Sequence, residues 1–374
     1  MIKMLKKNFT NLLGWRTKRR IIVIESDDWG MIRMSSKKAQ EDFIAKGYQI
    51  GQCPYNTNDS LESDDDVNLL REILLSVKDK YGNPAKFTLN NIVANPDFKK
   101  IEEHDFKTYH YESFEDTLNR QSDSKNVIML IKKGIAENVF QPQLHGREHI
   151  NTRLWLNRLQ ENDPKTMDAF KQKMFTVHKS GRINGRRDNL DTFGNSTVTG
   201  SNFDYQEHIK AAQQLFYDTW GFKSKSFIAP CYTWHPSVES ILKEEGIEFI
   251  QGAHVQRIPV DNSSFRIIKK HHFTGQKNKN NQRYLVRNCF FEPTEQGKEN
   301  LVEKTMKEIK TSFFYKTPAI ISSHRVNYIG SLNQENRNEN LKLLTELLNS
   351  IVTKWPDVEF FSSDQLGDLI TKNK

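Results

Sequence analysis

The sequence predicts an α/β fold in which the strands of a parallel sheet alternate with helices. Two observations support this prediction: short apolar runs alternate with longer amphipathic segments, and acids or histidines stand where several apolar runs end. The chain has 374 residues, which is enough for one large α/β domain with insertions or for two ordinary domains. Strands are expected at residues 21–24, 87–92, 139–144, 226–228, 249–252, 284–286, 319–322 and 358–361.

The strand over residues 139–144 is the least regular, because Pro142 cannot donate a ladder hydrogen bond. Residues 269–283 are rich in Lys, Asn and Gln, which predicts a solvated insertion. No internal repeat or linker divides residues 20–374, which we expect to form a single domain. Helices with one apolar face are expected at residues 66–78, 205–219, 237–245, 298–313 and 338–354.

Charge and cysteine content narrow the class of protein. The formal net charge is +8, but the lysines are spread along the whole chain, so no nucleic-acid partner is indicated. Cys53, Cys231 and Cys289 show no Cys-x-x-Cys spacing, which argues against a disulfide framework and against a structural zinc site. This cysteine usage suits a reducing compartment, so we expect a cytoplasmic protein.

The first 19 residues form a separate basic segment. It lacks the unbroken apolar stretch and the cleavage site of a signal peptide, and no part of the chain has enough consecutive apolar residues for a transmembrane helix. Two interpretations of the segment remain: a helix lying on an anionic membrane surface, or a terminal helix packed on the domain. Its apolar residues recur at helical spacing beside several lysines, at Ile2, Leu5, Phe9, Leu12 and Leu13.

Two adjacent acids, Asp27 and Asp28, follow the first predicted strand. Successive residues at the end of a strand point to different sides, so one carboxylate can bind a cation while the other takes a proton from an attacking water. Two acids beside a glycine, here Gly30, are also common in turns. The buried strand that precedes them favours a functional site.

His145 and His149 lie four residues apart after the third predicted strand. On a helical turn both imidazoles would face one side, as two ligands of a single ion must, although the pair could also be structural. Two imidazoles together with one carboxylate suit one Zn²⁺ or another divalent transition metal ion. Such an ion lowers the pKa of water and polarises a carbonyl group.

His324 stands one residue past the apolar run 319–323, so a second strand would deliver it to the same end of the sheet. There it could protonate a leaving group. A histidine at the end of a buried strand can also be a hydrogen-bonded structural residue. Its position at a strand end favours the functional interpretation.

These residues resemble the motifs of a known family, the polysaccharide deacetylases, also called carbohydrate esterase family four. Residues 26–30, Ser-Asp-Asp-Trp-Gly, resemble the first motif of the family, and residues 145–149, His-Gly-Arg-Glu-His, resemble the second. Residues 227–232 resemble the third motif, a wall of the substrate groove, and residues 320–324 resemble the last. The resemblance spans residues 20 to 361.

The resemblance implies both a fold and a reaction. The fold would be a distorted (β/α)7 barrel, and the reaction would be metal-dependent removal of an N- or O-linked acetyl group from a carbohydrate. Asp27 would be the catalytic base, and His324 the general acid. Asp28, His145 and His149 would hold the metal ion. The sugar would contact residues in or near the motifs, namely Trp29, Pro230, Tyr232, Trp234 and Arg287.

The chain also departs from the family pattern. Ile228 stands where the third motif usually has an arginine before its proline, and the Asp-x-x-Asp-Trp-like fourth motif is not evident. Arg287 is a candidate to replace that arginine in orienting the base, with a structural ion pair as the alternative. Trp29, inserted before Gly30, either lines the sugar site or packs in the core. We therefore expect a divergent member of the family.

Two other functions fit parts of the sequence. Residues 145–149 also match His-x-x-Glu-His, the inverted zinc-protease motif, with Glu148 as the base and a distant residue such as Glu239 as the third ligand. That motif needs a regular helix, which Gly146 disfavours. The second alternative is a barrel that binds a glycan without turnover. It does not require a base, an acid and three metal ligands, all of which this chain has as residue types.

Overall fold

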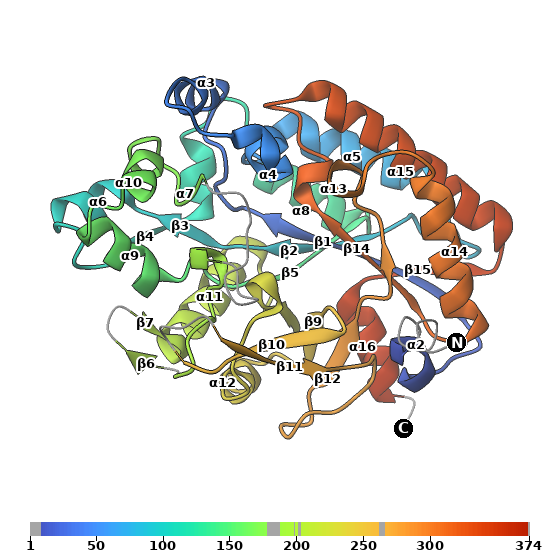
Figure 1. The fold of residues 1–374 in the computed structure, drawn as a ribbon. Coiled ribbons are helices and arrows are strands. Elements are labelled where there is room, and N and C mark those ends of the chain that lie inside the picture. The colour runs from blue at the N-terminus through green and yellow to red at the C-terminus, as the bar shows by residue number, and fades with distance from the viewer. Residues whose placement is uncertain (1–8, 178–187, 198, 201–202, 262–265, 373–374) are drawn as a thin grey trace.

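The computed structural model describes residues 9–177, 188–197, 199–200, 203–261 and 266–372. At its centre is a nine-stranded sheet whose ladders are all parallel (Figure 1). The neighbouring strands are, in order, β12 (Arg283–Val286), β9 (Phe249–Gly252), β8 (Ser226–Ile228), β5 (Phe140–Leu144), β2 (Phe87–Asn91), β1 (Arg20–Trp29), β14 (Ala319–His324) and β13 (Cys289–Phe290). The ninth strand, β15 (Val358–Phe361), pairs with the first half of β1.

The sheet is not closed by ladders. Its path ends at β12 on one side and at β13 on the other, and the chain connects these ends through Arg287 and Asn288. The backbone N–H of Arg287 donates to Gly252 on β9, and that of Asn288 donates to Ile320 on β14. The predicted α/β fold with parallel strands is confirmed. A barrel closed by continuous ladders is not found among the residues that the structure describes.

Helices surround the sheet, with α5, α8 and α15 above it, α14 at its right and α11, α12 and α16 below it in Figure 1. The apolar faces of all these helices except α16 share one large buried core with the sheet, and α16 packs in a second, smaller core with β1, β9, β12 and β14. The ends of several helices are fixed by the sequence: Ser63 and Asp66 form a capping box at the start of α5, and Gly221 ends α11 in the left-handed conformation. The bounds are α5 (Asp64–Ser76), α8 (Val127–Ala136), α11 (Tyr205–Trp220), α12 (Val238–Glu244), α14 (Leu301–Phe314), α15 (Gln334–Lys354) and α16 (Ser363–Lys372).

Shorter elements are inserted between the strands. Three antiparallel pairs are β3 (Ala94–Pro96) with β4 (Tyr111–Ser113), β6 (Thr199–Gly200) with β7 (Phe203–Asp204), and β10 (Val255–Pro259) with β11 (Ile267–His271). The remaining helices are α2 (Phe9–Leu13), α3 (Lys37–Ala45), α4 (Pro54–Asn58), α6 (Phe98–Glu103), α7 (Phe114–Asn119), α9 (Thr152–Gln160), α10 (Pro164–Lys171) and α13 (Pro293–Gln296). Four 3₁₀ turns are η1 (Ile50–Gln52), η2 (Asp188–Leu190), η3 (Pro230–Tyr232) and η4 (Arg325–Asn327).

The eight predicted strands and five predicted helices are all present, with ends that differ by a few residues. Residues 269–283 were predicted to be a solvated insertion, but the first three of them continue β11, whose pairing with β10 is not visible in their polar composition.

Pro142 does lie in β5, opposite Leu89 of β2. On its other side β5 pairs with β8 at one position only, and the Gln143 side chain accepts hydrogen bonds from the β8 region instead.

The described part of the N-terminal segment packs on the domain. Asn11 is buried, and its Oδ1 accepts hydrogen bonds from Asn288 and Thr317, while the backbone N–H of Trp15 donates to Thr274. Residues 1–8 lie outside the described residues, so membrane contact through this segment stays a prediction. Across the described residues, no helix combines the length and the apolar character needed to span a membrane.

Candidate active site

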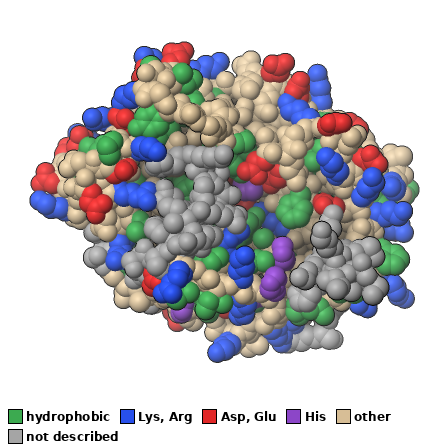
Figure 2. Space-filling view, in the orientation of Figure 1, with side chains coloured by type: hydrophobic (Ala, Val, Ile, Leu, Met, Phe, Trp, Pro, Cys, Tyr) green, Lys and Arg blue, Asp and Glu red, His purple; other side chains and the backbone are tan. Residues whose placement is uncertain are grey.

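Residues at the carboxyl ends of β1, β5, β8 and β14 surround a cavity of about 250 Å³. Carboxyl ends of parallel strands are the usual place for chemistry in α/β folds. Acidic and histidine side chains gather near the middle of the face shown in Figure 2. The cavity brings together all the residues predicted to act as base, acid or metal ligand: Asp27, Asp28, His145, His149 and His324.

A bulge at the end of β1 turns the carboxylates of Asp27 and Asp28 into the cavity. The register of β1 against β2 shifts between Ser26 and Trp29, and Asp28 has a φ of 77°. This left-handed conformation costs a non-glycine residue about 1–2 kcal/mol. In a regular strand Asp27 and Asp28 would point to opposite sides, as the sequence suggested, whereas here both line the cavity.

The strand ends at Gly30, where only glycine fits. Gly30 has a φ of 82°, and a Cβ atom there would lie 2.3 Å from the carbonyl oxygen of Ile92. Its N–H donates to Glu62 at 2.9 Å, which holds the turn after the two aspartates. The glycine therefore fixes the position from which Asp28 faces the cavity.

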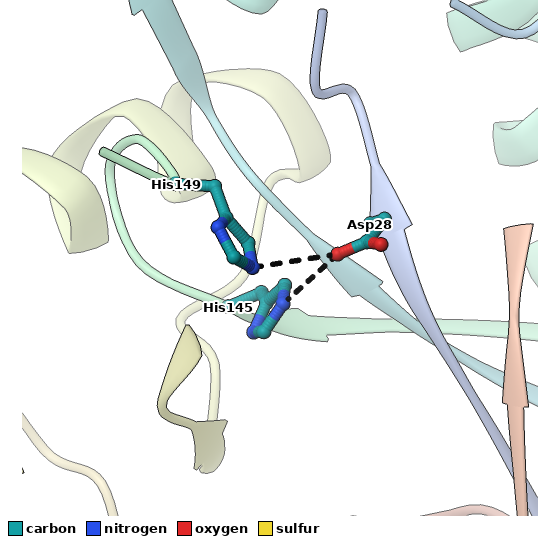
Figure 3. Close-up of side chains that lie close together, drawn as sticks. All are labelled: Asp28, His145 and His149. Carbon is teal, nitrogen blue, oxygen red and sulfur yellow. Dashed lines mark ion pairs between the residues drawn. The ribbon is translucent and has the colours of Figure 1, made fainter. Parts of the chain in front are cut away.

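Asp28, His145 and His149 form a buried group whose ligand atoms lie within 4.8 Å of one another. Figure 3 shows both imidazoles turned toward the carboxylate of Asp28. Nε2 of His145 lies 3.3 Å from Oδ1 of Asp28, and Nε2 of His149 lies 3.7 Å from the same oxygen. The histidines come from an irregular loop after β5 and not from the helical turn considered above, with Gly146 at a φ of 111°.

The surroundings of these three side chains suit a cation. Nδ1 of His145 donates to the carbonyl oxygen of Ile228 at 2.9 Å, and this hydrogen bond leaves Nε2 as the ring nitrogen that faces Asp28. This buried Nε2 has no hydrogen-bond partner among the residues that the structure describes. Burial lowers the pKa of His149 to about 3, which keeps its imidazole neutral. Burial alone would raise the pKa of Asp28, but the two histidines hold it well below its ordinary value, so the carboxylate is ionised.

The donor set therefore fits one divalent transition metal ion. A buried imidazole nitrogen without a hydrogen-bond partner is costly unless a ligand satisfies it. Two imidazoles and one carboxylate are also a ligand set that leaves open positions for water and substrate. The backbone carbonyl of Ile228 orients His145, so the residue type at position 228 is not critical for the ligand geometry.

Arg287 holds the other aspartate in place. Its guanidinium donates to both carboxylate oxygens of Asp27, at 2.6 and 2.8 Å, and its Nε donates to Glu25 at 2.7 Å. Asn90 donates a further hydrogen bond to Asp27 at 2.8 Å. Burial alone would raise the pKa of Asp27, but Arg287 lowers it to about 2, so Asp27 is ionised over the ordinary pH range.

His324 faces Asp27 from β14 and is oriented by a third carboxylate. Its Nδ1 lies 2.7 Å from Oε1 of Glu292, and its Nε2 lies 3.7 Å from Oδ2 of Asp27. Asn327 fixes Glu292 through a hydrogen bond of 2.8 Å to its second oxygen. Burial would lower the pKa of His324, but Glu292 and the two aspartates raise it well above its ordinary value of 6.5, so the imidazole carries a proton.

The predicted sugar-binding residues divide into two groups. Tyr232 lines the cavity, and its hydroxyl accepts a hydrogen bond of 3.0 Å from Arg287, which lies behind Asp27. Trp29 and Trp234 belong to the buried core and do not line the cavity, so the prediction that they contact a sugar is wrong for both residues. Pro230 is also buried behind the cavity wall. The indole N–H groups of the two tryptophans explain their positions, because Trp29 donates to Ser26 and Trp234 donates to Glu239.

The geometry does not support the inverted zinc-protease motif. Glu148 accepts hydrogen bonds from Arg147 and lies 3.3 Å from His208, so it is a buried ion-pair partner and not a base beside the metal ligands. Glu239 bonds to Trp234 and Tyr284, and it does not line the cavity. Residues 145–149 also form no helix.

Sequence reasoning missed the residues that orient the site. Glu292 was not singled out, although it lies in the same apolar segment as Arg287, and Glu25 and Asn90 were also missed. The signal that could have found them was position. Glu25 stands two residues before Asp27 on the same strand face, and Asn90 lies near the carboxyl end of the neighbouring strand β2.

No known protein-family model matches the sequence, and no curated protein matches it either. Among solved structures the chain is similar to a probable polysaccharide deacetylase from Pseudomonas aeruginosa PAO1, with 10% identity, a TM-score of 0.46, and coverage of 95% of this chain and 92% of that one. A second, described as a glycoside hydrolase/deacetylase from Parabacteroides distasonis, has 8% identity, a TM-score of 0.49, and coverage of 97% and 73%. A third is a 4-alpha-glucanotransferase from Thermococcus litoralis, with 10% identity, a TM-score of 0.46 and coverage of 96% of this chain; the chain spans only 41% of its length.

The neighbours thus include polysaccharide deacetylases, the family that the sequence motifs resemble. At identities near 10% and TM-scores below 0.5, the likeness concerns the path of the chain and not the chemistry.

Proposed function

We propose that the protein is a metal-dependent hydrolase that removes N- or O-linked acetyl groups from a carbohydrate. The observation that carries this proposal is the arrangement of one cavity, in which a three-ligand group, an ionised carboxylate and a protonated imidazole stand side by side. Hydrolysis of an acetyl group needs these three components: a site for an electrophilic cation, a base for water and an acid for the leaving group. A module that only binds a glycan needs none of them.

The base in this mechanism is Asp27. Its carboxylate accepts a proton from the water that attacks the acetyl carbonyl carbon, and Arg287 keeps both of its oxygens in a fixed orientation. Arg287 also makes Asp27 a weaker base than a free aspartate, because it stabilises the ionised form. The ion held by Asp28, His145 and His149 would supply Lewis-acid polarisation of the carbonyl and would make the attacking water more acidic.

The acid is His324. Glu292 accepts from its Nδ1, so its Nε2–H is directed toward the cavity and can protonate the departing nitrogen or oxygen when the tetrahedral intermediate collapses. The direct test of the function is to purify the protein, load it with Zn²⁺ and measure acetate released from acetylated oligosaccharides.

A leaving-group comparison tests the role of His324. We expect His324→Ala to lower kcat by about two to four powers of ten on an N-acetyl sugar, the usual effect of removing one positioned proton donor. The loss should be much smaller on an activated aryl acetate, whose leaving group needs no protonation. If the variant were equally impaired on both substrates, His324 would have a structural role and not that of the acid.

The pH dependence tests the role of Glu292. Activity requires His324 to be protonated and is lost as the pH rises through its raised pKa, so the alkaline limb of kcat/KM should lie well above pH 6.5. Asp27, with a pKa of about 2, should contribute a limb only in strong acid.

Glu292→Gln removes the largest charge that raises the His324 pKa, so we expect the alkaline limb to move to lower pH. Glu295→Gln, a change at the exposed rim, is the matched control. An unmoved limb in Glu292→Gln would rule out this charge as the cause.

A further inference from the structure

The cavity contains two arginines that the proposed reaction does not use, Arg33 and Arg257. The carboxylates deeper in the cavity already have partners in the protein or in the metal site. Asp27 is paired with Arg287, and Glu292 is bonded to His324 and Asn327. Asp28 belongs to the metal-ligand group. The remaining acid of the lining, Glu295, stands at the exposed rim.

Arg257 is held in place without a carboxylate partner among the described residues. Its Nη1 donates to the carbonyl oxygen of Cys231 at 2.6 Å, and its guanidinium lies 5.9 Å from the ring centre of Tyr232. These contacts fix the side chain on the wall formed by residues after β8. They leave Nη2 and Nε as donors for a bound molecule, and a half-buried guanidinium of this kind favours an anion.

The second arginine, Arg33, lies near His324, the proposed general acid. It is 8% exposed, its guanidinium lies 5.1 Å from the ring centre of Tyr55, and that ring contacts His324 edge-on at 5.9 Å. Its Nε is buried and has no hydrogen-bond partner within the described part of the chain. Its ion-pair partner is Asp59, whose Oδ2 lies 3.9 Å from this Nε, beyond hydrogen-bond distance, while Oδ1 of Asp59 lies 3.0 Å from Arg325. A buried donor without a partner is costly unless a ligand or water satisfies it.

The positive charge extends from Arg257 onto the β10–β11 hairpin. Arg257 pairs with Lys269, and Val255 pairs with His271, so Arg257, Lys269 and His271 share one face of the hairpin. Lys269 and His271 are exposed. A chain of sugars that leaves the cavity over this hairpin would therefore pass basic side chains.

From these contacts we infer that the substrate is an anionic carbohydrate, whose carboxylate or phosphate group is bound by Arg257, with Arg33 as a second cationic contact beside the acetylated position. This inference rests on the proposed function for the position of the acetyl group. The binding of an anion does not depend on the proposed function, because it is inferred from the two arginines alone. Both arginines would determine specificity and would take no part in proton transfer.

Three probes with a common N-acetylglucosamine unit distinguish the source of the negative charge. A hyaluronan tetrasaccharide carries carboxylates, N-acetylglucosamine 1-phosphate carries a phosphate, and chitotetraose is neutral. The zinc-loaded wild-type protein is expected to bind one of the anionic probes about ten times more tightly than the neutral one, measured by calorimetry at low salt. This preference should shrink as salt is added.

Arg257→Gln should abolish the preference, and Arg257→Lys should restore it only in part, because lysine lacks the planar pair of donors. Arg266→Gln removes an exposed charge at the start of β11, the other strand of this hairpin, and is the matched control, which should keep the preference. Thermal unfolding of each variant establishes that it is folded. Equal binding of neutral and anionic probes by the wild type would overturn the inference, as would a preference that survives in folded Arg257→Gln.

Acetate release separates this inference from the proposed function. If an anionic probe binds in an Arg257-dependent way and no acetate appears, the anion site stands and the hydrolase proposal falls. If acetate is released equally well from neutral and anionic probes, the hydrolase proposal stands and the anion site falls.

Discussion

The double variant His145→Ala, His149→Ala is expected to lose the metal ion and, with it, all measurable turnover. Each imidazole contributes one of the three ligand atoms, and a single carboxylate such as Asp28 does not hold a transition metal ion tightly on its own. Elemental analysis of the wild-type protein should give about one ion per chain, and that of the variant close to none.

A matched control and a stability measurement complete this test. His104→Ala removes an exposed histidine outside the cavity and should leave the metal content unchanged. Adding Zn²⁺ should raise the melting temperature of the wild type, because an ion that binds only the folded state stabilises it, but not that of the double variant. If the folded double variant retained one ion per chain, the assignment of the ligands would be wrong.

Asp27→Asn is expected to keep the metal ion and to lower kcat by about two to four powers of ten, the usual contribution of a positioned general base. The amide has nearly the same shape as the carboxylate, but it cannot accept a proton from water at neutral pH. Arg287 would still be paired with Glu25, so the change leaves a buried charge pair in place. Metal content and acetate release should be measured on the same preparation.

Two comparisons keep this result interpretable. Asp28→Asn changes the neighbouring carboxylate, which lies in contact range of both histidines, and it should weaken metal binding as well as activity. Loss of the metal in Asp27→Asn, or wild-type turnover in that variant, would show that the roles of the two aspartates are assigned wrongly.

The sequence was sufficient to predict the strands and the residues at their ends. Asp27, His145 and His324 were recognisable because each follows a short apolar run, and parallel strands bring such positions to one edge of the sheet. The bulge turns the side chain of Asp28 to the same side as that of Asp27. It was not predictable, because it depends on the pairing of β1 with β2 and on the close approach of Gly30 to Ile92.

The residues that orient the catalytic side chains were harder to predict from the sequence. Glu292 orients His324 from 32 residues away, and Arg287 pairs with Asp27 across 260 residues, so neither pair shows a local spacing. Trp29 stands next to the metal ligand Asp28 and still points into the core, because its indole N–H bonds to Ser26. Adjacency in the sequence does not decide which side of a strand a large side chain occupies.

The central claim, that the site removes acetyl groups with the help of a metal ion, is tested most directly by acetate release from one preparation in three states. These are the zinc-loaded protein, the same protein after chelation, and the protein after zinc has been restored. We predict that acetate is released from an acetylated oligosaccharide in the first state, that release stops in the second, and that it returns in the third. A protein that binds about one ion per chain but releases no acetate from neutral or anionic acetylated sugars would contradict the proposal.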